Sequence, residues 1–285
     1  MKLSKLKGII DGLNNIHAKG IIHRNLHSGN IFFNKNKPSS SDVVIGDLGI
    51  SKSATESTDN NENYGIIPYM APEIFQGHKY TMASDVYSFG MIMWEFMTCR
   101  RPFWDRNHDI ELIIEICEGL RPPIVTNAPE GYIELMKECW HFGPNKRPTA
   151  ADIYDKINRI WDNEWKIYKK NPTKIIPSSD IGPVTINNPG AIYKSRPLNG
   201  MIQSAMYLWN SKSQSINLNI DPFYYYQKKS TIDKRRFEND LIENNNDKDQ
   251  IIKRRRLFEN ENNGYLTKEI EIELDNNMRS YYQGN

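Results

Sequence analysis

Apolar side chains in the first twenty residues recur at steps of three and four positions. They occupy positions Leu3, Leu6, Ile9, Ile10, Leu13 and Ile16. This spacing gathers them on one face of a helix. Gly20 follows, and glycine is a typical residue just after the end of a helix. The pattern therefore predicts a helix over the first twenty residues that packs through one apolar face.

Two short apolar runs come next, at residues 31–33 and 43–45, with a polar stretch between them. Short runs of aromatic and β-branched residues around a polar connection predict the two strands of a hairpin. From Gly46 to Tyr69 the chain is rich in Ser, Thr and Asn and has no helical period. We expect this stretch to be an exposed, mobile loop.

Four further helices are predicted from their apolar periodicity. Residues 85–97 are apolar nearly all round, which is typical of a buried helix. Residues 109–120 are amphipathic, and residues 132–140 form a short helical pattern. The last helix begins at residue 148 with Thr149 as its N-cap, and it extends to about residue 168.

The composition changes near Asn171. Beyond it the chain has Pro-Gly breaks, a Ser-rich stretch and frequent Asn. A packed core is hard to build from such residues. We therefore expect a folded domain over residues 1–168 and a mostly disordered Asn-rich tail over residues 169–285.

Length and composition narrow the class of protein. A chain of 285 residues can form one or two domains. Its formal net charge of +2 gives no argument for a nucleic-acid partner, and we expect none. The three cysteines are odd in number and unclustered, which argues against a disulfide framework or a zinc site, so we expect buried thiols. Because no run of 18 apolar residues and no signal peptide is seen, we expect an intracellular, cytoplasmic protein with no membrane partner.

Three short motifs then follow one another at suggestive separations. Residues 23–30 read His-Arg-Asn-Leu-His-Ser-Gly-Asn, residues 47–49 read Asp-Leu-Gly, and residues 71–73 read Ala-Pro-Glu. In this order they resemble the catalytic loop, the metal-binding motif and the Ala-Pro-Glu motif of the protein kinase family. Residues 84–90 also match the family, as do residues 139–140 and 146–149. The last two matches, together with residues 69–73, most resemble the tyrosine-kinase-like group of serine/threonine kinases.

The resemblance implies a mainly α fold over residues 1–168: a protein-kinase-like C-terminal lobe, or large lobe, with a short β-hairpin, followed by the disordered tail. Nothing in the chain resembles the small lobe, with its Gly-rich phosphate loop and its lysine. We therefore expect either a small lobe encoded upstream or another chain that covers the exposed upper edge.

Three departures from the family pattern lie near the expected catalytic centre. Asn25 stands at the position of the catalytic Asp, and we expect its NH₂ to face a substrate hydroxyl with the wrong polarity. Loss of a general base lowers a rate by roughly 10²–10⁴-fold. His27 stands where many kinases place a lysine against the transferred phosphate, and Ile66 where they place a threonine. A relaxed catalytic network is one interpretation; the other is that Asn25 only holds the shape of the loop.

Other positions match binding residues of the family. Arg24 matches an arginine that receives an activation-loop phosphate. Asn30 and Asp47 match the two magnesium ligands, both oxygen donors as a hard cation requires, and Phe32 matches the residue beneath the adenine ring. The resemblance thus implies ATP and Mg as cofactors, with binding weak or absent in this chain. The alternative for Asp47 is that it only caps a turn.

Four residues have structural roles under the same resemblance. Glu73 and Arg147 should form a buried ion pair. Asp85 should accept hydrogen bonds from backbone amides of the catalytic loop, and His23 should pack beneath that loop as a core residue.

Two hypotheses of function follow. The first is an ATP-dependent serine/threonine phosphotransferase, catalytically impaired in this chain. The second is a pseudokinase fragment that acts in signalling as a protein-binding module, so that a protein is expected as substrate or partner. In the tail, the basic cluster from Lys253 to Arg256 fits a nuclear-import signal, or else a solvated run of charge.

Overall fold

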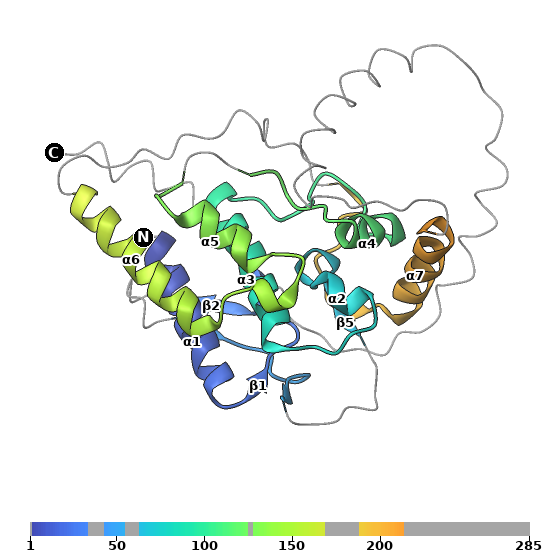
Figure 1. Ribbon diagram of the computed structural model, residues 1–285, viewed down its shortest axis with the longest axis horizontal. Helices are drawn as coiled ribbons and strands as arrows, with labels where there is room; N and C mark the ends of the chain where they lie inside the picture. The colour runs from blue at the N-terminus through green and yellow to red at the C-terminus, as the bar shows by residue number, and fades with distance from the viewer. Residues whose placement is uncertain (1, 34–42, 55–62, 125–127, 169–187, 214–285) are drawn as a thin grey trace, which may run out of the picture. The chain divides into compact units, whose positions relative to one another are not determined.

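A computed structural model describes residues 2–33, 43–54, 63–124, 128–168 and 188–213 (Figure 1). The chain divides into two units, Met1–Lys228 and Lys229–Asn285, and every described element belongs to the first. The described part is mainly helical with small two-stranded sheets. This confirms the predicted fold class.

The helices and strands are short apart from four longer helices. The helices are α1 (Lys2–Ala18), α2 (Pro72–Phe75), α3 (Met82–Thr98), α4 (Ile110–Cys117), α5 (Tyr132–Cys139), α6 (Ala150–Tyr168) and α7 (Asn199–Ser213). The strands are β1 (Ile21–Ile22), β2 (Ile31–Phe33), β3 (Val43–Ile45), β4 (Lys52–Ser53), β5 (Tyr64–Gly65) and β6 (Arg196–Pro197). Single 3-10 turns lie at Ser28–Asn30, Ile67–Tyr69 and Pro144–Lys146.

The core is built around α3, which is buried from Ser84 to Trp94. Such a helix needs apolar residues on every side, and this confirms the prediction for residues 85–97. Helix α1 lies along α6 (Figure 1) and buries the apolar face that its spacing predicted. It ends before Gly20, whose φ of +70° lies in the left-handed region that favours glycine.

The predicted hairpin is also confirmed. Strands β2 and β3 are antiparallel, and Phe32 is paired with Val44 at their centre. Residues 34–42, which connect them, lie outside the described residues. The hairpin extends directly from the motif at residues 23–30, so it helps to position that loop.

Local caps define where two of the predicted helices begin. The side chain of Asp109 accepts a hydrogen bond from the Leu112 amide at 3.2 Å and caps α4. Thr149 and Asp152 bond reciprocally, since each side chain accepts from the backbone amide of the other residue. The prediction of Thr149 as an N-cap is thereby confirmed.

The expectation of an exposed, mobile loop from Gly46 to Tyr69 is wrong at its end. Residues 65–69 are buried, because the turn Ile67–Tyr69 packs against α3. The Ser88 hydroxyl donates to the Tyr69 carbonyl oxygen at 2.7 Å and holds the turn there. Residues 55–62 lie outside the described part of the chain.

The expectation of disorder beyond residue 168 is wrong where the structure describes β6 and α7. Strand β6 pairs antiparallel with β5, and α7 lies alongside α4 (Figure 1). These elements are ordered by contacts with residues about a hundred positions away, which composition does not register. Residues 169–187 and 214–285, including Lys253 to Arg256, lie outside the described residues. The domain boundary at residue 168 stays a prediction.

The cysteines divide into two kinds. Cys117 and Cys139 are buried, as predicted. Cys99 is exposed, so the prediction is wrong there: this residue follows α3 in the left-handed conformation, with φ of +54°, and its side chain leaves the helix face that packs inward.

Candidate active site

The buried carboxylate of Asp85 holds the backbone of the loop at residues 23–30. Asp85, in the first turn of α3, is 1% exposed. Its oxygens accept from the backbone amides of His23 at 2.8 Å and Arg24 at 2.9 Å, as predicted. The His17 ring donates to the same carboxylate at 2.9 Å. Arg24 has φ of +69°, which is unusual for a non-glycine residue, and these buried bonds stabilise it.

His23 is fully buried beneath the loop, as predicted. Its Nδ1 accepts from the Asn25 amide at 3.3 Å, and its Nε2 lies 3.0 Å from the Gly46 carbonyl oxygen. Because a carbonyl oxygen can only accept, Nε2 carries the ring proton. The ring therefore links the loop to Gly46, just before Asp47. Both ring nitrogens are engaged in hydrogen bonds, so neither is available for catalysis.

Asn25 points its amide in a defined direction. Its Nδ2 donates to Asp47 Oδ2 at 3.0 Å, and its Oδ1 accepts from the hydroxyl of Ser195 at 3.2 Å. The expectation that the NH₂ would face a hydroxyl is therefore wrong, because the Asp47 carboxylate can only accept and binds the NH₂ instead. Asn30 Nδ2 also donates to Asp47 Oδ2 at 3.2 Å, and to the Asn25 carbonyl oxygen at 2.9 Å.

His27 lies on the other side of the same hydroxyl. Its Nδ1 accepts from the Gly29 amide at 3.1 Å, so the neutral ring carries its proton on Nε2, which lies 3.3 Å from Ser195 Oγ. Burial, with a smaller contribution from His23, lowers the pKa of His27 to about 4. At neutral pH this position therefore holds an uncharged donor.

Arg24 contacts Tyr80 and the backbone at Ile50. Its guanidinium sits over the Tyr80 ring, 4.6 Å from the centroid, and Nη1 donates to the Ile50 carbonyl oxygen at 3.4 Å. Its Nε is buried without a hydrogen-bond partner among the described residues. The predicted role of Arg24 toward a phosphate stays a prediction.

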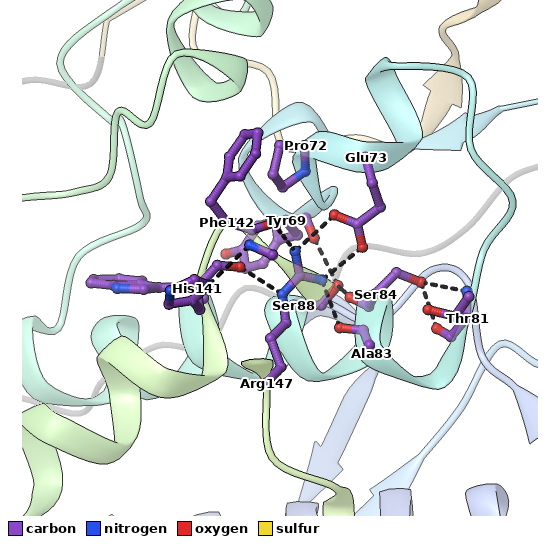
Figure 2. A network of polar contacts seen from close by, with 12 residues as sticks. Tyr69, Pro72, Glu73, Thr81, Ala83, Ser84, Ser88, His141, Phe142 and Arg147 are labelled. Carbon is purple, nitrogen blue, oxygen red and sulfur yellow. Dashed lines mark hydrogen bonds and ion pairs between the residues drawn. The ribbon is translucent and has the colours of Figure 1, made fainter. Parts of the chain in front are cut away.

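Glu73 and Arg147 form the predicted buried ion pair (Figure 2). Arg147 Nη1 and Nη2 each donate to one carboxylate oxygen at 2.7 Å. The guanidinium also donates to the carbonyl oxygens of Ala83, His141 and Phe142. This network ties the end of the Ala-Pro-Glu motif to α3 and to the turn before α6.

Comparison with known proteins matches the same region. The family model described as protein tyrosine and serine/threonine kinase matches residues 1–157. The chain belongs to this kinase family. It is 36% identical over 160 residues to a putative serine/threonine-protein kinase/receptor of Acanthamoeba polyphaga mimivirus. In Dictyostelium discoideum it is 35% identical over 153 residues to a probable serine/threonine-protein kinase and 36% identical over 154 residues to the dual specificity protein kinase shkE.

These matches cover 55%, 53% and 52% of this kinase-family chain. The chain spans 9%, 16% and 21% of the length of the three relatives. The similarity thus lies in one part of each protein. None of the helices in the described part of the chain combines the length and hydropathy needed to cross a lipid bilayer.

Kinases use ATP and Mg in general, and two residues here could hold the cation. Among the described residues, Oδ1 of Asn30 and Oδ1 of Asp47 accept no hydrogen bond, and Mg²⁺ prefers such oxygens. No group of three or more His, Cys, Asp or Glu suited to a metal occurs in the described residues. The donor set therefore fits a cation held by two side chains together with phosphate oxygens. Phe32, 41% exposed on β2, could lie beneath an adenine ring.

Sequence reasoning missed Ser195, the residue whose hydroxyl contacts both Asn25 and His27. It lies in the stretch that composition assigned to disorder. A signal was present nearby, because Leu198, Ile202 and Ala205 follow the step of four and three that marks a helix face.

Proposed function

We propose that this chain is a kinase-family domain that transfers phosphate poorly or not at all and acts mainly as a protein-binding module in signalling. The observation that carries the proposal is the hydrogen bond from Asn25 Nδ2 to Asp47 Oδ2. It leaves the amide oxygen of Asn25 facing the position of a hydroxyl, and an amide oxygen does not remove a proton at neutral pH.

Neither His27 nor Ile66, the other two departures from the family pattern, replaces the missing base. His27 could act as a base only through an unprotonated nitrogen, and its Nδ1 already accepts from Gly29. Ile66 is 3% exposed and apolar, so it cannot orient Asn25. Because a kinase works mostly by positioning groups and neutralising charge, an uncharged His27 contributes no positive charge toward the transferred phosphate.

Nucleotide binding should depend on Asn30 and Asp47. When bound, Mg–ATP would supply the phosphoryl group, and these two side chains would hold the cation through their oxygens. Phe32 and Leu48, 41% and 47% exposed, bury little of a ligand, whereas good small-molecule sites bury roughly 70–90% of it. Weak binding is therefore the expected state of this chain. The competing function, an ATP-dependent serine/threonine phosphotransferase, draws its support from family membership and from this pair of oxygen donors.

The decisive experiment follows phosphate from labelled ATP with Mg into the full chain and into a generic peptide. We expect incorporation equal to that of Asp47→Ala, and little gain in Asn25→Asp because His27 is still uncharged. Incorporation by the unmodified chain that Asp47→Ala abolishes, while the exposed-site control Asp11→Ala retains it, would overturn the proposal. A thermal shift with millimolar Mg–ATP should be near zero. A large shift that disappears in Asp47→Ala would contradict the expectation of weak binding.

A further inference from the structure

We propose that residues 188–213 are an intramolecular peptide ligand of this lobe, and that the groove they fill binds a similar peptide in trans. The pattern it recognises is an aromatic residue, any residue, Ser, Arg, any residue and an aliphatic residue, as in Tyr193 to Leu198. This rests on the proposed function in one respect, that the lobe binds protein segments. We call residues 188–213 the docked segment.

Backbone pairing sets the direction of the docked segment. Strand β6 pairs antiparallel with β5, with Arg196 opposite Gly65. The pairing continues at Leu198, whose amide donates to the Asn63 carbonyl oxygen at 2.8 Å. The Asn63 amide in turn donates to Asn199 Oδ1 at 2.9 Å. Addition of a strand to an exposed edge is a general way to hold an extended peptide.

The pairing places one hydroxyl between Asn25 and His27, two of the three side chains that depart from the kinase pattern. Ser195 donates to Asn25 Oδ1 at 3.2 Å and can accept from His27 Nε2 at 3.3 Å. One neutral acceptor and one neutral donor match a neutral hydroxyl. A phosphate group on Ser195 would add a charge of about −1.5 to −2 next to two uncharged partners. The site is therefore suited to hold an unmodified Ser.

Side chains on both sides of Ser195 supply specificity. Tyr193 donates from its hydroxyl to the Pro102 carbonyl oxygen at 2.9 Å, and its ring stands edge-on to His108 at 4.8 Å between centroids. The Arg101 guanidinium lies over the Tyr193 ring, 4.9 Å from its centroid. On the C-terminal side of Ser195, the Arg196 guanidinium donates to the His108 carbonyl oxygen at 2.7 Å.

Apolar burial anchors the end of the docked segment. Leu198 and Ala205 are 0% exposed and Ile202 is 6% exposed. They join the core of the lobe where α7 lies alongside α4 (Figure 1). By contrast, Tyr207 on the same helix is 77% exposed. One face of α7 is thus used for docking and another is left in solvent.

A ligand joined to its own groove competes strongly with one in solution. Attachment to the same chain makes binding of the docked segment intramolecular, so it acts at a high effective concentration. The apparent affinity for a second peptide equals its intrinsic affinity multiplied by the fraction of molecules whose groove is open. If about nine in ten grooves are filled, the intact chain should bind the peptide about tenfold more weakly than a chain whose segment is released.

The test uses the full chain and a fluorescent peptide with the sequence of residues 188–213. Leu198→Asp with Ile202→Asp should release the docked segment, and Tyr207→Asp, which also introduces an Asp but at an exposed position of α7, is the control. We expect the released chain to bind the peptide at least about tenfold more tightly than the intact chain, and the control to behave like the intact chain. A peptide carrying Leu198→Asp should bind none of them.

Hydrogen exchange supplies a readout that does not depend on the peptide. The amide of Leu198 should be protected in the intact chain and exposed in the released one, with Arg196→Ala as a milder variant if the double change unfolds the domain. Equal peptide binding by intact and released chains, or an unprotected Leu198 amide in the intact chain, would overturn the proposal. No ATP is present, so phosphate transfer found separately would overturn the proposed function alone.

Discussion

Breaking the buried ion pair between Glu73 and Arg147 should strongly destabilise the lobe, and Glu73→Gln is the change that tests it. The substitution keeps the shape of the side chain but removes its charge. It also turns an NH₂ toward the guanidinium, where two donors face each other. Arg147 keeps its bonds to three backbone carbonyl oxygens (Figure 2), so its charge stays buried without a carboxylate.

The expected magnitude follows from burial. The side chains of Arg147 and Glu73 are 0% and 8% exposed. Loss of one partner of a buried pair costs about 3–5 kcal/mol, because the other charge remains in a medium of low polarity. A typical domain has a free energy of unfolding of about 5–15 kcal/mol. The single change should therefore remove a large part of the stability of this lobe.

The measurement is urea unfolding of the full chain, followed by circular dichroism. The matched control is Lys156→Met, which breaks the pair with Glu138 on the surface, where the side chains are 37% and 44% exposed. Exposed pairs contribute about 0–1 kcal/mol. If Glu73→Gln cost no more than the control, at an unchanged dependence on urea, the reasoning from burial would be refuted. The double variant of Glu73→Gln with Arg147→Met should cost less than the sum of the single changes.

Three further predictions concern protonation, thiols and proteolysis. Because the pKa of His27 is about 4 when folded and about 6.5 when unfolded, the unfolded state binds more protons between these values. The free energy of unfolding should fall as pH decreases through this range, by up to about 3 kcal/mol, and a pH series on His27→Asn should be flatter; equal slopes would contradict this. Cys99 should react with a thiol reagent faster than Cys117 and Cys139, whose pKa values are raised by burial; three equal rates would count against the fold. Limited proteolysis should spare residues 188–213, and early cuts inside them would show that they do not dock.

Much of the fold was predictable because it depends on local patterns. The helix that became α1 was found from the steps between its apolar residues, and α3 from its apolar residues on every side. The roles of Asp85, Glu73 and Arg147 came with motifs whose spacing is set by the fold itself. Such features need only neighbouring residues, or a known motif, to be recognised.

The parts that were missed depend on distant contacts. Strand β6 has only two residues, and α7 lies in a stretch whose Ser and Asn content suggested disorder. Both are ordered by β5 and α4, far away in the sequence. The direction of the Asn25 amide was also missed, because it is decided by Asp47, which the loop's own sequence does not contain. Propensity and composition carry no information on such partners.

Asp85 bonds to the backbone of the loop and not to the side chains at the candidate catalytic positions. The shape of the loop is therefore set separately from the chemistry of those side chains. The Asp85 carboxylate fixes the backbone of His23 and Arg24 from inside the core. A substitution in the side chain of Asn25 or His27 therefore leaves these two bonds to the loop backbone in place. The loop backbone would then keep its shape whichever side chains stand at positions 25 and 27, and it could still bind a peptide segment.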